Sequence, residues 1–136
     1  MNINSYYPVI CVKNVQESAD FYQKYFDFKL VFQNDWYIHL TKENQPEFNL
    51  AFVSRDHPSV PAIMRKSAQG ILLNFEYDNV DELYKRSKAE GHRILLDLRD
   101  EPWGQRHFIL RDPAGVMVDV IKIIEPSQEF LQNYKI

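Results

Sequence analysis

Four histidines and one cysteine are the residues of this 136-residue chain best suited to nucleophilic, acid–base or metal chemistry. His39, His57, His92 and His107 are scattered along the sequence, and no two have the i, i+4 spacing that places two imidazoles on one helix face. Each is therefore interpreted as a surface or hydrogen-bonded histidine. Cys11 lies in an apolar run with no base beside it, which is typical of a small core residue rather than a nucleophile.

Aromatic side chains are the stronger candidates for binding groups, since Phe, Trp and Tyr make up 14% of the chain. Tyr7, Trp36, Tyr37 and Trp103 offer ring faces for stacking and for cation–π attraction. Core packing is the alternative interpretation of each. The sequence contains neither a glycine-rich phosphate loop nor a G-x-S-x-G nucleophile elbow.

Two matching strand-to-helix junctions indicate how these residues are positioned. Asn14 and Glu17 have the spacing of a capping box after an apolar run, and Asn79 and Glu82 repeat it 65 positions later. Apolar residues then recur at three- and four-residue steps, which predicts a first helix to about Tyr25. The equal order of elements at both places predicts an internal repeat.

Each half is predicted to contain a strand, a helix and three more strands. The predicted strands are 7–12, 30–33, 36–41 and 48–53 in the first half, and 71–77, 93–97, 106–111 and 116–123 in the second. Residues 42–47 are predicted as a turn segment, Gly91 as the left-handed end of the second helix, and Asp112-Pro113-Ala114-Gly115 as a type I turn.

The domain organisation predicted from these elements is one domain, 1–136. It comprises a first module at about 6–53, a linker at 54–69, a second module at about 70–123 and a C-terminal tail at 124–136. Ser127 is placed to cap a short helix in the tail.

Composition excludes several classes of protein. The 16 basic and 19 acidic residues give a net charge of −3, without the basic surface that nucleic-acid binding needs. No apolar stretch is long enough to span a bilayer and the start has no signal-peptide pattern, so a cytoplasmic protein without membrane partners is expected. A single cysteine excludes an intrachain disulfide.

The repeated modules, the junction from Val12 to Tyr22 and the Asp112-Pro113-x-Gly115 turn resemble the vicinal oxygen chelate superfamily. That superfamily includes glyoxalase I, extradiol dioxygenases, and fosfomycin and bleomycin resistance proteins. The segments Pro102-Trp103-Gly104 and Arg106 to Gly115 look most like the bleomycin resistance branch.

The resemblance implies an α+β fold in which tandem βαβββ modules form curved mixed sheets around a cleft, with the helices outside. Strand alternation then decides which side chains face the cleft. The expected cleft residues are Tyr7, Val9 and Cys11 on the first strand, Leu72, Asn74 and Glu76 on its repeat, and Met117, Asp119 and Ile121 on the last strand.

Metal-using relatives place imidazole and carboxylate ligands where this chain has Tyr7, Leu72 and Asp119. Leu72 has no donor atom and a phenol is a poor ligand near neutral pH, so no metal and no cofactor are expected. Arg106 and His107 are adjacent on a strand, and Arg106 is chosen as the one that faces inward. Asp119 and Glu76 are also candidates for a carboxylate pair that transfers protons.

The function predicted from these residues is capture of a flat or cationic small molecule, an antibiotic or a metabolite, without metal. Its expected ligand-binding residues are Tyr7, Trp36, Tyr37, Asn74, Glu76, Trp103, Arg106 and Asp119. The alternatives are a lyase, isomerase or dioxygenase of the same superfamily, and an interaction module with a vestigial cleft. A homodimer whose cleft combines modules of two chains is expected, because symmetric pairing is the commonest assembly of soluble proteins.

Overall fold

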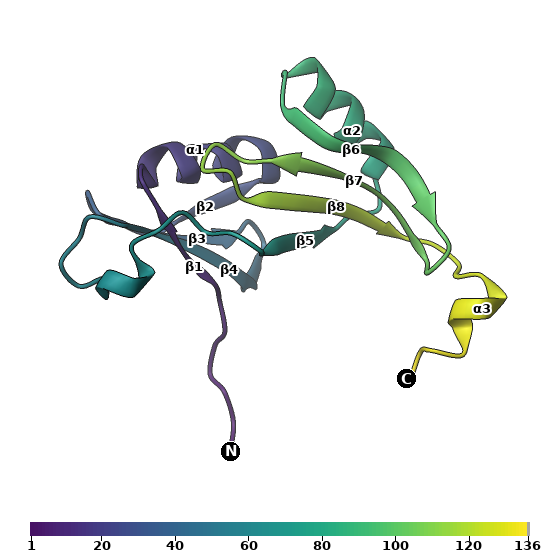
Figure 1. The fold of residues 1–136 in the computed structure, drawn as a ribbon, viewed down its shortest axis with the longest axis horizontal. Coiled ribbons are helices and arrows are strands. Elements are labelled where there is room, and N and C mark those ends of the chain that lie inside the picture. The colour runs from purple at the N-terminus through teal and green to yellow at the C-terminus, as the bar shows by residue number, and fades with distance from the viewer. Residues whose placement is uncertain (136) are drawn as a thin grey trace. The chain divides into compact units, whose positions relative to one another are not determined.

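The computed structural model describes residues 1–135 and divides the chain into two compact units. The first consists of Met1–Gln69 with Pro113–Gly115, and the second of Gly70–Asp112 with the segment that begins at Val116. Each unit has the order strand, helix, strand, strand, strand (Figure 1). The predicted α+β class and the tandem βαβββ modules are confirmed.

The first unit is a four-stranded mixed sheet with a helix on one face. Its elements are β1 (Val9–Val12), α1 (Val15–Phe26), β2 (Phe28–Gln33), β3 (Tyr37–Lys42) and β4 (Gln45–Ser54). The strand order is β1-β4-β3-β2; β1 pairs with β4 in parallel and the other pairs are antiparallel. A short 3-10 helix, η1 (Ala62–Met64), lies in the predicted linker.

Helix α1 begins where the capping box predicts. The Asn14 side chain accepts a hydrogen bond from the Glu17 backbone N–H at 3.0 Å, which satisfies one of the free donors of the first turn. The helix then buries Tyr22 against the sheet, where its ring stacks on Phe52 of β4 at 5.5 Å between centroids. Because Phe52 is paired with Ile10 and Ile38, this face of the sheet is the core of the unit.

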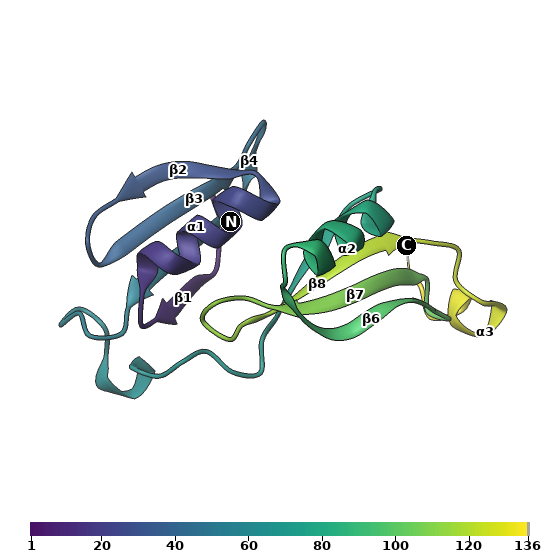
Figure 2. The same ribbon diagram turned by 90° about the horizontal axis from the view of Figure 1, so that it is seen from above.

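The second unit repeats this architecture and ends in a short helix. Its elements are β5 (Leu72–Glu76), α2 (Val80–Ala89), β6 (Arg93–Glu101), β7 (Gln105–Arg111), β8 (Met117–Ile123) and α3 (Gln128–Leu131). The strand order is β5-β8-β7-β6, and α2 packs on one face of β6, β7 and β8 (Figure 2). Tyr84 of α2 meets the fully buried Phe108 edge-on, and Gly91, at φ 74°, ends the helix region as predicted.

Several predicted boundaries are wrong for local reasons. β4 begins at Gln45, inside the predicted 42–47 turn, because Asn44 adopts φ 63° and closes a tighter hairpin. β6 continues to Glu101, four residues beyond its predicted end. Asn79 and Ser127 precede α2 and α3 as predicted, but neither side chain makes a capping hydrogen bond. Trp36 precedes β3 instead of starting it.

None of the helices within residues 1–135 has the length and apolar character needed to cross a membrane.

Candidate functional site

Four polar and aromatic side chains gather on the face of the first sheet opposite α1. Tyr37 and His39 alternate along β3 with the buried Ile38 and so share that face. The Tyr7 ring lies 4.6 Å from the His39 ring, and His39 Nε2 is 2.9 Å from Asn49 Oδ1 on β4. Burial raises the pKa of the Tyr37 phenol, and the neighbouring Tyr7 phenol raises it further.

An apolar pocket of about 390 Å³ opens beside this cluster. Its walls combine residues of the sheet with residues of the segment after β4: Val9, Phe32, Trp36, Tyr37, Val60 and Met64. A volume of this size falls in the range of small-molecule sites. Tyr37 belongs both to the pocket wall and to the polar cluster, so an aromatic surface and hydrogen-bonding groups meet at one place.

Trp36 is held in a defined orientation. Its backbone N–H donates to Asn34 Oδ1 at 3.0 Å, and its indole stacks on the His57 ring at 3.6 Å with an interplanar angle of 9°. Trp36 and Tyr37 also pack against a small buried cluster that includes Cys11. Cys11 is buried and unpaired by disulfide, in keeping with its interpretation as a core residue.

A chain of ionisable groups crosses the sheet of the second unit. His107 on β7 lies 2.8 Å from Asp119 on β8 through Nδ1, and 2.8 Å from Glu101 on β6 through Nε2. Arg99 Nε donates to the same Glu101 oxygen at 2.9 Å. The side chains of His107 and Asp119 are each 5% exposed.

The two carboxyl groups that contact His107 have pKa values shifted in opposite directions. Burial raises the pKa of Asp119, and the hydrogen bond from His107 offsets part of that rise. The pKa of Glu101 is lowered, first by the hydrogen bond from His107 and then by Arg99. Asp119 is therefore linked to Glu101 through His107, which contacts both carboxyl groups. Glu76, the residue expected to pair with Asp119, is instead an exposed residue on β5.

The expectation that Arg106 faces inward in preference to His107 is wrong. Arg106 points to the helix side of the sheet, where Nε donates to Asp81 of α2 at 2.8 Å and Nη1 donates to Asp100 at 2.9 Å. These contacts raise the pKa of Arg106 and lower that of Asp81. Strand alternation then places His107 on the Asp119 face.

The remaining predicted residues of the second unit fall in two places. Asn74 is directly paired with Asp119 across β5 and β8 and is exposed on the same face, as is Glu76 two residues further on. Trp103 lies in the turn between β6 and β7, where its indole N–H donates to Gln105 and its ring meets Phe130 of α3.

Sequence reasoning missed five residues of these clusters: His39 and Asn49 in the first unit, and Arg99, Glu101 and His107 in the second. Glu101 lay outside every predicted strand, and nothing in its neighbourhood indicated a buried carboxylate. His39 and His107 were interpreted as surface or hydrogen-bonded residues, and alternation with Ile38 and Phe108 was the signal that places each on the face opposite the helix.

The residues present do not fit a divalent metal site of the superfamily type. Leu72 has no donor atom, and Asp119 Oδ1 is already bonded to His107. Within the 135 residues that the structure describes, no group of three or more His, Cys, Asp or Glu is arranged to hold a metal ion.

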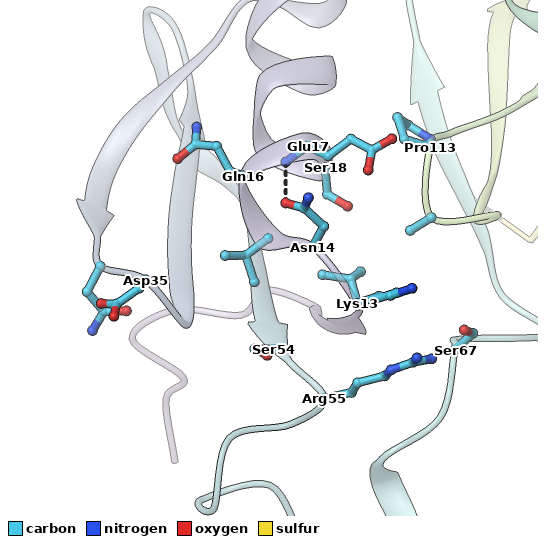
Figure 3. A pocket seen from close by; sticks show the side chains of 14 residues that line it. Lys13, Asn14, Gln16, Glu17, Ser18, Asp35, Ser54, Arg55, Ser67 and Pro113 are labelled. Carbon is cyan, nitrogen blue, oxygen red and sulfur yellow. Dashed lines mark hydrogen bonds between the residues drawn. The ribbon is translucent and has the colours of Figure 1, made fainter.

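A second, polar pocket of about 780 Å³ lies at the start of α1 (Figure 3). It is lined by Lys13, Asn14, Ser18, Asp35 and Arg55 among others. Figure 3 shows the Asn14 side chain turned back to the Glu17 backbone, so this amide serves the helix rather than the pocket.

Comparison with known proteins identifies the fold. Similar solved structures include one described as a conserved domain protein, which is 29% identical with a TM-score of 0.69 and covers 90% of this chain and 99% of its own. A glyoxalase/bleomycin resistance protein/dioxygenase from Nocardioides is 19% identical with a TM-score of 0.72, covering 92% and 86%. A lactoylglutathione lyase from Agrobacterium tumefaciens is 20% identical with a TM-score of 0.70, covering 90% and 96%.

A search of curated proteins finds no matching relative. The sequence profile of one family, however, matches residues 5–120, which is most of the chain and includes both repeated modules. This chain belongs to the Glyoxalase/Bleomycin resistance protein/Dioxygenase superfamily.

Proposed function

We propose that this chain is a small-molecule binding protein that captures a flat aromatic or cationic ligand on the sheet face of its first unit. The observation that carries the proposal is the apolar pocket of about 390 Å³ whose wall includes Trp36 and Tyr37. Ring faces of this kind bind planar ligands by stacking and cations by the ring quadrupole.

The proposed cargo is an antibiotic or a metabolite that is sequestered rather than transformed, as in the bleomycin resistance branch that the sequence resembles. A cytoplasmic location accompanies this role. The second unit carries Asn74, Glu76 and Asp119 together on one face of its own sheet. Trp103 is a weaker candidate, because its ring and indole N–H already contact Phe130 and Gln105.

A lyase, isomerase or dioxygenase of the same superfamily is the second candidate. One observation favours it: burial raises the pKa of Asp119, which makes this carboxylate a better proton acceptor than an exposed one. A neighbour described as a lactoylglutathione lyase shares the fold at 20% identity.

The binding proposal predicts that Trp36→Ala weakens ligand capture by about 1 to 3 kcal/mol, the usual effect of removing a stacked aromatic anchor. Planar aromatic compounds, cationic glycopeptides and small acyl metabolites would first be screened on Trp103→Phe protein, in which Trp36 is the sole tryptophan reporter. The affinity of the best ligand would then be measured by calorimetry for wild type and Trp36→Ala. If no compound binds with a dissociation constant below about millimolar, and Trp36→Ala only lowers the free energy of unfolding, then the indole is a packing residue and the proposal is wrong.

The metal-free proposal predicts less than stoichiometric zinc, nickel or iron in purified protein, because Leu72 stands at a position where relatives need a donor. Elemental analysis of protein purified without chelators measures it. About one metal ion per chain, lost in Asp119→Ala, would contradict the binding-protein interpretation and favour the enzyme.

We also propose a homodimer. The edge strand β2 exposes three consecutive apolar side chains, Leu30, Val31 and Phe32, which are 45%, 56% and 52% exposed. Exposed apolar edge strands of this kind favour association. Light scattering at micromolar concentration should give about twice the chain mass of 16.2 kDa, and Val31→Lys should shift the mass toward the monomer. A wild-type mass near 16 kDa throughout the concentration range would refute the proposal.

A further inference from the structure

The orientation of the Asn49 amide is set by the hairpin between β3 and β4. Asn49 Nδ2 donates to the Pro46 carbonyl at 2.8 Å, a contact that only the nitrogen end of the amide can make. The oxygen end, Oδ1, is therefore the atom that faces His39, at 2.9 Å from Nε2.

This contact determines which nitrogen of His39 carries the proton. Because Asn49 Oδ1 can only accept, His39 Nε2 must be the donor. In the neutral imidazole the other nitrogen, Nδ1, is then an acceptor with a free lone pair. Nδ1 has no hydrogen-bond partner within the described part of the chain.

The surroundings of His39 suit an aromatic ligand. Its ring is half-buried beside the Tyr7 ring, two residues from Tyr37, which lines the apolar pocket. Tyr7 and His39 are not part of the pocket lining but lie beside its Tyr37 wall on the same sheet face. A flat ligand that extends from the apolar pocket along this face therefore reaches an imidazole nitrogen that can only accept.

We propose that His39 Nδ1 is a specificity-determining acceptor that selects ligands with an aromatic hydroxyl or a ring N–H, namely phenols and N–H heteroaromatics. The inference rests on the proposed function, because it names the ligand class of the same site. Asn49 is the positioning residue that maintains the accepting tautomer.

A pair of probes that differ only in the donor tests this. 2-Naphthol has an aromatic hydroxyl, and 2-methoxynaphthalene has the same ring system without a donor. Calorimetric titration of wild type should give about three- to tenfold tighter binding of 2-naphthol, the usual net effect of one neutral hydrogen bond. His39→Phe keeps an aromatic ring beside Tyr7 and should bind both probes with equal affinity.

His57→Phe is the matched control, because His57 Nδ1 is already bonded to Ser59 Oγ at 2.7 Å. This variant should retain the preference for 2-naphthol. A measurement that needs no variant is the ¹⁵N resonance of His39 Nδ1 in wild type, which should move with 2-naphthol and not with 2-methoxynaphthalene.

The outcomes separate this inference from the proposed function. Equal binding of both probes by wild type, persistence of the preference in His39→Phe, or an unmoved Nδ1 resonance would overturn the role of His39 while leaving a binding protein. Failure of wild type to bind either probe or any planar aromatic ligand would overturn the proposed function, and this inference with it.

Discussion

Replacing His107 with leucine should lower the free energy of unfolding by about 3 to 5 kcal/mol at pH 7. The substitution leaves Asp119 buried without its ionic partner, and breaking one side of a buried ionic contact has costs of this size. Leucine fills a similar volume, so the loss measures the missing donor more than a cavity. Urea unfolding followed by circular dichroism measures it.

The effect of His107→Leu should shrink as the pH falls. In wild type the lowered pKa of Glu101 contributes stability that is present above the ordinary glutamate pKa and is lost on acidification. In the variant the pKa of Asp119 rises further, because the lowering effect of the His107 hydrogen bond is gone, so its folded form takes up a proton at a higher pH than in wild type. The two stability curves should therefore converge as the pH falls toward and below the ordinary glutamate pKa.

Arg106→Leu is the neighbouring control for His107→Leu. Arg106 pairs with side chains of Asp81 and Asp100 that are 57% and 61% exposed, and exposed ion pairs contribute little. This variant should change stability far less. Adding Asp119→Leu to His107→Leu should recover part of the loss, because a buried ionic contact replaced on both sides by apolar groups costs little. An equal loss in Arg106→Leu, or a pH-independent loss in His107→Leu, would contradict the assignment.

Phe52→Ala should destabilise the protein by about 3 to 5 kcal/mol, the usual cost of a phenylalanine cavity in a core. Phe52 is fully buried and stacks on Tyr22, so its removal takes away an aromatic contact between α1 and β4. Losses of this size are a large share of the stability of a small protein.

Phe48→Ala is the control on the same strand, because the Phe48 side chain is 54% exposed. Its expected effect is below about 1 kcal/mol. Urea midpoints for the two variants should differ clearly at similar m-values. Similar midpoints would mean that α1 is held by other contacts.

The order of elements could be predicted from the sequence because its signals are local. Asn14 and Asn79 mark strand-to-helix junctions through short-range capping chemistry and apolar spacing, and both helices begin there. The sequence also singles out Tyr7 and Tyr37 as aromatic binding candidates, and the structure brings their side chains together. It could not foresee that only Asn14 makes its capping bond, since that depends on the backbone angles of each junction.

The partners of the polar side chains were decided by strand register, which links residues far apart in the sequence. Asp119, His107 and Glu101 meet because β8, β7 and β6 are neighbours and because β6 continues to Glu101. His39 meets Asn49 only through the pairing of β3 with β4. The sequence by itself determined the order of the elements and their repeat, because these follow from local periodicity and capping, and the α+β class followed from the family that these elements resemble. Only the tertiary structure decided which ionisable groups touch, because cross-strand pairing leaves no periodic signal along the chain.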